Sequence, residues 1–337
     1  MNSPEGPVRI ARYDATMRGA WDAFVRSSKN GTFLHERAYC EYHADRVVDA
    51  SLLAFDDRNR IVGLLPASVQ GDVVTTHGGL TYGGLLTDVS MTLPLALTVF
   101  DALLTALKDV GVRRLVYRAI PQPYHRFPCG EDLVAMFLLD AGLTKRSALA
   151  VVDQLARIPL QSRRRRGAMR AAAAGISIAA SNDLPAYWEL LTQVLRETYD
   201  SQPVHSLSEI INLKHHFPQN ITLQCAWLGG KMVAGVLVYE TAQVARAQYI
   251  AAGPDGKEHH ALDLLFQTLL DHTYVTKRYF DFGTSERAGA RVLNRGLVEQ
   301  KEGFGARLVP QDQYEVDIAA YVPAGLLNTF GSEGAAP

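Results

Sequence analysis

Short apolar runs, separated by glycine, proline and polar residues, divide the first half of the chain into predicted strands and helices. Runs typical of strands lie at 8–14 and 113–120, and runs with helical spacing lie at 16–28 and 93–111. Residues 50–70 hold two further apolar segments around a polar Arg-Asn turn, which predicts a hairpin. This order predicts a sheet that is flanked by helices.

The same order recurs in the second half of the chain. A strand is predicted at 176–183, a helix at 185–200, and a hairpin at 221–240 that turns at Gly229-Gly230. The repeated order predicts two tandem domains of the α/β class. Each is expected to be a mixed, largely antiparallel sheet flanked by helices.

Domain boundaries follow from this repeat. We expect an N-terminal domain at 1–155 and a C-terminal domain at 156–321. Residues 322–337 end in small and polar residues, so we expect them to form a loose tail.

Residues 245–285 carry the pattern that is most informative about function. They predict a strand, a glycine-bearing loop at 253–261, a helix and a second strand. A loop that enters a helix leaves backbone N–H groups unpaired, with the positive end of the helix dipole behind them, and so suits a pyrophosphate. Gly256 is expected to allow close approach of the ligand to the backbone, and Lys257 adds positive charge.

This strand-loop-helix-strand order resembles the acyl-CoA-binding half of the GNAT acyltransferases. The continuation FDFGTS…LNRGLVEQKEGFGAR resembles the two-domain, Fem-type members of that superfamily. The segments HGGLTYGGLL (77–86) and PVHSLSEI (203–210) are similar to a bacterial subset that is associated with surface-polysaccharide assembly. The residues that match the Fem-type ending are Phe280, Asp281, Phe282, Gly283, Lys301, Phe304 and Gly305.

The resemblance implies acetyl-CoA or a longer acyl-CoA as the donor, bound by the second domain. The loop sequence GPDGKEHHA departs from the usual Arg/Gln-x-x-Gly-x-Gly/Ala pattern. The expected cofactor-binding residues are Ala251, Gly253, Gly256, Lys257, His260, Ala261, Asn294 and Lys301.

Acyl transfer to an amine needs a held donor, a neutral acceptor nitrogen and hydrogen-bond donors for the developing oxyanion. By resemblance, the reacting carbonyl lies near Tyr249 to Ala251. His205 is the candidate general base, and Glu209, four residues later, would share its face and orient it if the segment is helical. His205 as a structural residue satisfied by a neighbour is the alternative; the amine then either binds already neutral or loses its proton through water held by His77 or Asp281.

Two other segments are candidates for substrate binding. In SRRRRGAMRAAAAG (162–175), a helix would present Arg163, Arg166 and Arg170 on one side, either as a phosphate clamp or as a solvated face. By resemblance, the glycine-rich segment at 77–86 lines the acceptor site. The expected acceptor-binding residues of the first half are His77, Tyr82, Tyr124 and His125.

Composition narrows the class of protein. The 34 basic and 35 acidic residues leave a formal charge of -1, so no global field favours nucleic acid. Three well-separated cysteines argue against a disulfide framework or a zinc site, and His259-His260 lacks the further ligands of a metal shell. We see no transmembrane run or signal peptide and expect a cytoplasmic protein.

These observations together predict a cytoplasmic, acyl-CoA-dependent N-acyltransferase of the GNAT superfamily. The acceptor implied by the resemblance is a nucleotide-linked amino sugar used for surface polysaccharide, and no nucleic-acid partner is expected. The alternatives are a Fem-type transferase that moves an amino acid from aminoacyl-tRNA to a peptidoglycan precursor, and a non-catalytic tandem GNAT binding module.

Overall fold

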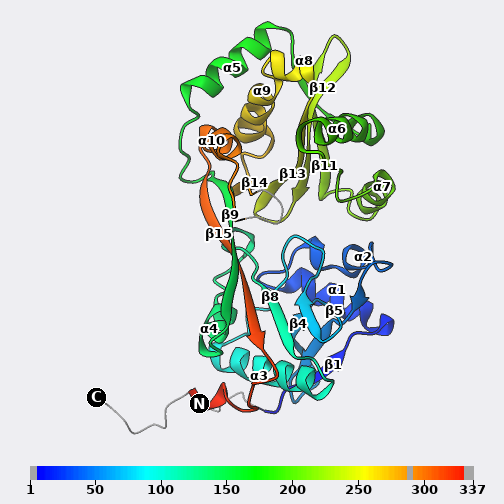
Figure 1. The fold of residues 1–337 in the computed structure, drawn as a ribbon, viewed down its shortest axis with the longest axis vertical. Helices are drawn as coiled ribbons and strands as arrows, with labels where there is room; N and C mark the ends of the chain where they lie inside the picture. Colours follow the sequence, from blue (N-terminus) through cyan, green and yellow to red (C-terminus); the bar gives the residue numbers. More distant parts are fainter. Residues whose placement is uncertain (1–5, 287–290, 330–337) are drawn as a thin grey trace, which may run out of the picture. The chain divides into compact units, whose positions relative to one another are not determined.

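The computed structural model describes residues 6–286 and 291–329. The chain divides into two compact units, which are coloured along the sequence in Figure 1. Unit 1 comprises the residues up to Arg146 together with those from Gln311 onward, and unit 2 comprises Ser147–Pro310. The C-terminal segment therefore belongs to unit 1, where the sequence had placed residues up to 321 in the second domain. Part of the expected tail, 330–337, lies outside the described residues, and Leu327–Thr329 forms a short 3₁₀ helix, η5.

Unit 1 contains two groups of paired strands. One is an antiparallel sheet in the order β1-β3-β4-β7, and in the other β8 pairs with β15 antiparallel and with β6 parallel. The strands are β1 (Arg9–Arg12), β2 (Val48–Asp49), β3 (Leu52–Phe55), β4 (Ile61–Leu65), β5 (Ala67–Gln70), β6 (Val73–Thr76), β7 (Leu86–Thr87), β8 (Arg114–Arg118) and β15 (Arg307–Asp317). The helices are α1 (Arg18–Ser27), α2 (Arg37–Cys40), α3 (Leu93–Asp109) and α4 (Glu131–Leu138).

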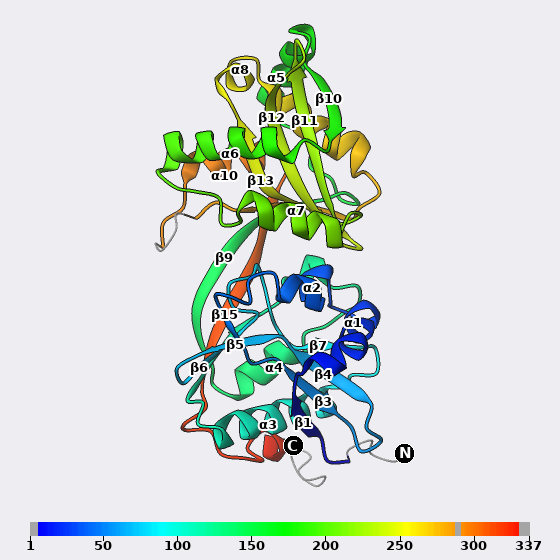
Figure 2. The ribbon, with the colours of Figure 1, turned by 90° about the vertical axis from the view of Figure 1, so that its right-hand side faces the viewer.

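The core of unit 1 forms around the predicted helix at 93–111, which is α3. Thr92 caps its start by accepting the N–H of Leu95, and Pro94 occupies a position where a missing N–H costs nothing. Its apolar face is buried, and Phe100 meets Tyr117 of β8 edge-to-face. In Figure 2, α3 crosses unit 1 beside β1 and β3.

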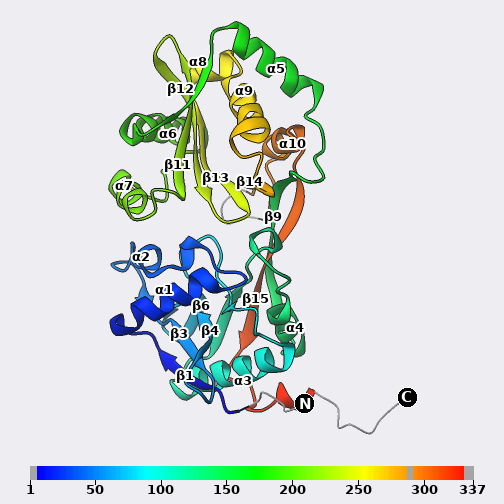
Figure 3. The ribbon, with the colours of Figure 1, turned by 180° about the vertical axis from the view of Figure 1, so that it is seen from behind.

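Unit 2 is a mixed sheet in the order β10-β11-β12-β13-β14-β9, in which only the β13–β14 pair is parallel. The strands are β9 (Gly142–Asp153), β10 (Ser177–Ser181), β11 (Ile221–Leu228), β12 (Lys231–Glu240), β13 (Val244–Ala252) and β14 (Tyr279–Thr284). The helices are α5 (Ser162–Ala173), α6 (Leu184–Tyr199), α7 (Leu207–His216), α8 (Pro254–Glu258), α9 (Ala261–Thr268) and α10 (Arg295–Gly303). Helices α6 and α7 lie on one face of this sheet and α5, α9 and α10 on the other, as Figure 3 shows.

Phenylalanines of the Fem-like motif build the core beneath this second group of helices. Phe266 of α9 lies 4.8 Å from Phe282 and 5.1 Å from Phe304, ring centre to ring centre, and Phe280 packs beside them. The FDFG and FG segments therefore meet through their aromatic side chains. The phenylalanines of this motif therefore have a packing role in the core, separate from any role in catalysis.

Two local predictions differ from the structure. The expected loop at 253–261 contains the helix α8, because Pro254 at its first position and Asp255 in its first turn both favour a helical start. The helix expected at 262–277 ends as α9 at Thr268 and continues as a π-helical turn, η4 (Leu269–Thr273).

Candidate active site

The parallel strands β13 and β14 separate after only three paired positions. The pairs are Val244–Tyr279, Ala245–Phe280 and Arg246–Asp281. From Ala247 to Ala252, β13 continues to pair with β12, and within the described residues it has no strand partner on its other side. Backbone N–H groups at such an open edge can polarise a carbonyl that enters the gap.

A buried ion pair closes the base of this gap. Arg246 Nη1 lies 2.6 Å from Asp281 Oδ2, and the Asp281 side chain is fully buried. The other carboxylate oxygen, Oδ1, accepts the N–H of Gly283 at 2.7 Å. Asp281, expected from the sequence to be catalytic, therefore fixes the end of β14 to β13.

Lys301 fixes the same strand end from α10. Its Nζ donates to the carbonyl oxygens of Gly283, at 3.1 Å, and Thr284. Burial lowers the pKa of Lys301 to about 8, so its neutral form is accessible slightly above neutral pH. Asp281, Gly283 and Lys301, which all belong to the Fem-like motif, are thus linked by hydrogen bonds in the structure.

A bulge interrupts β13 beside the gap. Leu237 pairs with Tyr249 but Val238 pairs with Ala247, so Gln248 is an extra residue. The hydroxyl of Tyr187, from α6, occupies this irregularity: it donates to the Tyr249 carbonyl at 2.9 Å and is hydrogen-bonded by the Leu237 backbone. Tyr187 is not predictable from the sequence, because its importance depends on a bulge that has no sequence signal.

His205 and Tyr249 form the most direct contact between predicted catalytic residues. His205 Nδ1 lies 2.6 Å from the Tyr249 hydroxyl, which also accepts the backbone N–H of His205 at 3.3 Å. In the tautomer that leaves Nδ1 unprotonated, the Tyr249 hydroxyl donates to Nδ1 while its oxygen accepts the backbone N–H of His205. His205 is buried, whereas Tyr249 is partly exposed.

Glu209 caps the start of α7 instead of orienting His205. Its Oε2 accepts the N–H of Ser206 at 2.6 Å, and Ser206 Oγ accepts the N–H of Glu209. This is a capping box at the start of α7. The hydrogen-bond partner of His205 Nδ1 is therefore the Tyr249 hydroxyl, and the Glu209 carboxylate bonds the backbone at the start of α7.

A hollow lies beside α6, on the side of the helix that carries Trp188. It has a volume of about 430 Å³ and is lined by one side of α6 and by Leu207 at the start of α7. Trp188 lines it and also meets the Tyr249 ring edge-to-face at 5.3 Å. Trp188 thus links the hollow to the aromatic side chains around Tyr249.

Gly256 is required for packing in this structure. It is buried, and a Cβ atom at this position would lie 2.2 Å from the carbonyl oxygen of Val233 on β12. The amides of Lys257 and His259 are bonded to the carbonyls of Gly253 and Asp255, within and around α8. The expected open loop of amides is therefore a helical turn that packs on β12.

The first turn of α9 already holds a carboxylate. Asp263 is buried, and its Oδ1 accepts a hydrogen bond from Arg164 Nη1 at 2.8 Å. Arg164 also lies over the Phe304 ring, and Gly167 leaves room for Asp263, since a Cβ there would lie 1.9 Å from Oδ2. Helix α5 is thus bound to α9 at the end where a pyrophosphate would be expected.

The remaining predicted cofactor residues lie along this segment or at helix ends. Ala251 is buried in β13, Gly253 donates its N–H to Val233, and His260 precedes Ala261 with a positive φ of 56°. Asn294 caps α10 by accepting the N–H of Leu297 at 3.2 Å.

The arginines of α5 have different environments. Arg163 Nη2 donates to the Glu299 carbonyl at 2.6 Å, whereas Arg166 and Arg170 are exposed. Within the described residues, no ion pair involves Arg166 or Arg170. Their charge is therefore available to an anion from solution.

Of the acceptor residues expected in unit 1, His77, Tyr82 and Tyr124 are buried and His125 is half-buried. The Tyr82 and Tyr124 rings lie 4.7 Å apart, and both side chains are buried. His77 Nδ1 contacts the Tyr82 carbonyl, and His125 Nε2 lies 3.0 Å from the Ile120 carbonyl. Burial lowers the pKa of both histidines. The structure thus gives these side chains partners within unit 1.

Comparison with known proteins identifies the fold. Residues 160–289 match the family model described as an acetyltransferase (GNAT) domain. No match was found among curated proteins. The chain is similar to the crystal structure of FemX, at 12% identity and a TM-score of 0.65, over 91% of this chain and 96% of that one.

Two other solved structures have the same fold. The structure of L-PGS from Bacillus licheniformis aligns at 12% identity and a TM-score of 0.58, over 94% of this chain and 95% of that one. A tandem GNAT protein from the clavulanic acid biosynthesis pathway aligns at 10% identity and a TM-score of 0.51, over 94% and 100%. The predicted fold class, tandem GNAT-like units with mixed sheets and flanking helices, is confirmed.

Neither a metal site nor a membrane span is found in the described part of the chain. No group of three or more His, Cys, Asp or Glu side chains within residues 6–286 and 291–329 is placed to hold a metal ion. In the same residues, no helix combines the length and the apolar character that crossing a bilayer requires.

Proposed function

We propose that unit 2 catalyses N-acyl transfer, in which an amine attacks a carrier-bound acyl carbonyl in the gap between β13 and β14. The observation that carries this proposal is the His205–Tyr249 contact on the strand that borders the gap. The match of residues 160–289 to a GNAT acetyltransferase domain supports the same reaction class.

The contact supports a two-step movement of the acceptor's proton. As the amine nitrogen bonds to the carbonyl carbon, its proton passes to the Tyr249 oxygen while the Tyr249 proton passes to His205 Nδ1. The bond from the carbonyl carbon to the carrier's sulfur or oxygen then breaks. The leaving atom takes the proton back from the imidazolium through Tyr249, so the enzyme returns to its starting state.

Backbone N–H groups along the open edge of β13 would stabilise the oxyanion. The Arg246–Asp281 pair fixes β14 to β13 at the base of the gap, and Lys301 fixes the end of β14, so the borders of the gap need little rearrangement during the reaction. This arrangement favours positioning and electrostatic stabilisation as the main sources of rate.

Acyl-CoA is the proposed donor and the amino group of a nucleotide-linked sugar the proposed acceptor, on the grounds of the GNAT match and the sequence resemblance. One observation favours the second candidate, a Fem-type aminoacyl-tRNA donor. Asp263 places a carboxylate in the first turn of α9, where a CoA pyrophosphate would otherwise bind. Exposed Arg166 and Arg170 on α5 remain for contact with a larger polyanion.

The test is a transfer assay with acetyl-CoA, longer acyl-CoAs and aminoacyl-tRNA as donors and amino sugars as acceptors. His205→Ala and Tyr249→Phe should each lower kcat by ~10²–10⁴, and the double variant should be no slower than the slower single variant. Glu209→Gln is the matched control and should keep most of its kcat, because its carboxylate caps α7. Additive losses in the double variant, or no loss in either single variant, would contradict the relay.

A further inference from the structure

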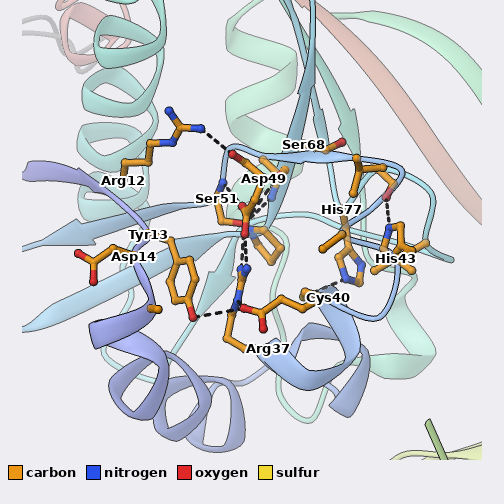
Figure 4. Close-up of a pocket in the computed structure, with 18 residues that line it drawn as sticks. Arg12, Tyr13, Asp14, Arg37, Cys40, His43, Asp49, Ser51, Ser68 and His77 are labelled. Atoms are coloured by element: carbon orange, nitrogen blue, oxygen red, sulfur yellow. Dashed lines mark hydrogen bonds and ion pairs between the residues drawn. The ribbon is translucent and has the colours of Figure 1, made fainter. Parts of the chain in front are cut away.

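The pocket of unit 1 that Figure 4 shows is balanced in charge. Its buried Arg37 donates to Glu41 at 3.0 Å and to Asp49. Arg18 lies 3.1 Å from the same Glu41, and Arg12 at the rim donates to the carbonyl oxygen of Asp49. The charged groups of this pocket therefore already have partners within unit 1.

A groove elsewhere on unit 1 differs, because it combines apolar walls with carboxylates. It has a volume of about 590 Å³ and lies between the end of α4 and the residues that follow β15. Its apolar lining includes Leu138 and Val322, and its polar lining includes Asp140, Glu315 and Asp317. Among the described residues, no lysine, arginine or histidine lines it.

The apolar surface continues along α4 beyond the groove. Phe137 is 82% exposed, and Leu133, one helical turn before it on the same face, is 43% exposed. Val322, which is 69% exposed, borders the groove from the segment after β15. Large apolar side chains that gather on one surface of a domain are typical of an interaction site.

The rim of this apolar surface carries two carboxylates without a cation. Glu315 lies 3.7 Å from Arg114, which balances its charge. Within residues 6–286 and 291–329, neither Asp140 nor Asp317 takes part in an ion pair. Asp317 Oδ1 accepts the N–H of Ala320 at 3.1 Å, and this contact leaves its charge in place.

Lys108 also reaches the border of the groove, where an aspartate offsets its charge. Its Nζ donates to the Tyr321 carbonyl at 2.6 Å, and Asp101, from the same helix, accepts the Tyr321 hydroxyl. The two unpaired aspartates therefore leave the rim negative. A negative rim repels an anionic lipid surface and attracts a basic partner.

Helix α5 carries a surface of the complementary kind. Met169 is 72% exposed on its outward face. Arg165 and Arg166 lie one turn before Met169, Arg170 follows it, and all three arginines are exposed. The small Ala173, one turn further on, leaves Met169 as the protruding apolar side chain among these arginines. Aromatic residues, Met and Arg are the types that are enriched in protein interfaces.

We propose that α5 of one copy of this chain docks on the α4 groove of a second copy. Met169 would pack against Phe137 and Val322, and the arginines beside Met169 would face the two unpaired aspartates. A contact between two α4 grooves would instead bring like carboxylates together. The contact is therefore heterologous: each copy offers one helix and one groove, and assembly continues past the dimer unless a ring closes.

Sedimentation velocity on the full chain tests this contact. Because a polyanionic donor would compete for the arginines of α5, no acyl or aminoacyl donor is added. Phe137→Lys with Val322→Lys removes the groove surface, and Arg166→Glu with Met169→Glu removes the helix surface. All four side chains are exposed, so both variants should keep the fold, which thermal unfolding checks.

The wild type should associate as its concentration rises. This association should weaken at least ~10-fold when the salt concentration is raised from about 0.05 to about 0.5 M, a result that needs no variant. Val48→Lys with Val275→Lys is the matched control and should associate as the wild type does. It adds the same charge at exposed apolar positions that lie outside α5 and do not line the groove.

Each surface variant alone should stay monomeric. An equal mixture of the two should form dimers and nothing larger, because it offers one intact groove to one intact helix. The proposal is overturned by a monomeric wild type, by association that is insensitive to salt, by either surface variant associating as the wild type does, or by a mixture that stays monomeric. A monomeric wild type would leave the groove to a basic segment of another protein. None of these measurements involves acyl transfer, so they are independent of the relay test on His205 and Tyr249.

Discussion

Tyr187 donates a hydrogen bond to the carbonyl oxygen of Tyr249 at 2.9 Å, across the bulge in β13. Its ring lies against Gly235, where a Cβ atom would approach to 2.7 Å. The side chain of a helix therefore completes the hydrogen bonding of a strand at the point where that strand carries the candidate proton relay.

Replacement of Tyr187 by Phe tests this link. The ring stays but the Leu237 N–H and the Tyr249 carbonyl lose their partner, so the free energy of unfolding should fall by about 1–3 kcal/mol. If the hydroxyl also positions Tyr249, kcat should fall while the KM for the donor stays nearly constant. Urea unfolding and steady-state kinetics measure the two effects, and an unchanged stability would show that water replaces the hydroxyl.

Replacement of Gly256 by Val should destabilise the protein by more than about 2 kcal/mol, because the new side chain would collide with the Val233 carbonyl. Gly19→Ala is the matched control: no heavy atom lies within 4 Å of a Cβ there, and α1 should gain up to about 1 kcal/mol. Thermal unfolding distinguishes them. A Gly256→Val protein of normal stability and reduced donor affinity would restore the interpretation of Gly256 as a ligand-approach residue.

Two arginines of α5 should behave oppositely. Arg164→Ala leaves the Asp263 carboxylate buried without its cation, so we expect a loss of about 2–4 kcal/mol in the free energy of unfolding. Arg166→Ala should change stability by less than about 0.5 kcal/mol, and should weaken binding of a phosphate-bearing donor in a salt-sensitive way. Chemical denaturation measures the stability of both variants, and donor titrations at two salt concentrations measure the binding. Unaltered donor binding by Arg166→Ala would show that Arg166 is only a solvated surface residue.

Lys301 should make stability rise with pH above 8. The pKa of Lys301 is about 8 in the folded protein and 10.5 when the side chain is exposed in the unfolded chain. Between these two pH values the unfolded chain therefore binds more protons than the folded protein. Relative to Lys301→Met, the wild type should gain about 1–2 kcal/mol in unfolding free energy from pH 8 to 9.5. Subtracting the variant removes the contribution of the buried thiols and tyrosines, and a pH-independent difference would show that Lys301 stays charged.

Much of the sheet was predictable, because its strands and hairpins are specified by local apolar runs and by turn residues such as Gly229-Gly230. His205, Tyr249, Asp281 and Lys301 were all named from the sequence. Their partners were not, since Arg246 meets Asp281, and Tyr187 meets Tyr249, only through strand register and helix packing.

The loop at 253–261 shows why the remaining details could not be predicted. Its glycine fits both an anion-binding turn and a close helix–strand contact, and only the position of the Val233 carbonyl decides between them. The buried Arg164–Asp263 pair is similar: a run of four arginines predicts a charged surface, yet one of them pairs with a buried aspartate for which Gly167 leaves room.

Unit 2 occupies one continuous stretch of sequence, whereas unit 1 needs both ends of the chain. Strand β8 pairs with β15 from Gln313–Arg118 to Asp317–Arg114, so this part of unit 1 lacks its partner until residues 313–317 have been made. During synthesis, unit 2 is complete once residue 310 has been added, and it can then fold as a unit. The N-terminal part of unit 1 still has an open sheet edge at that stage. Truncation before residue 313 should therefore impair the unit that contains the N-terminus and spare the one in the middle of the chain.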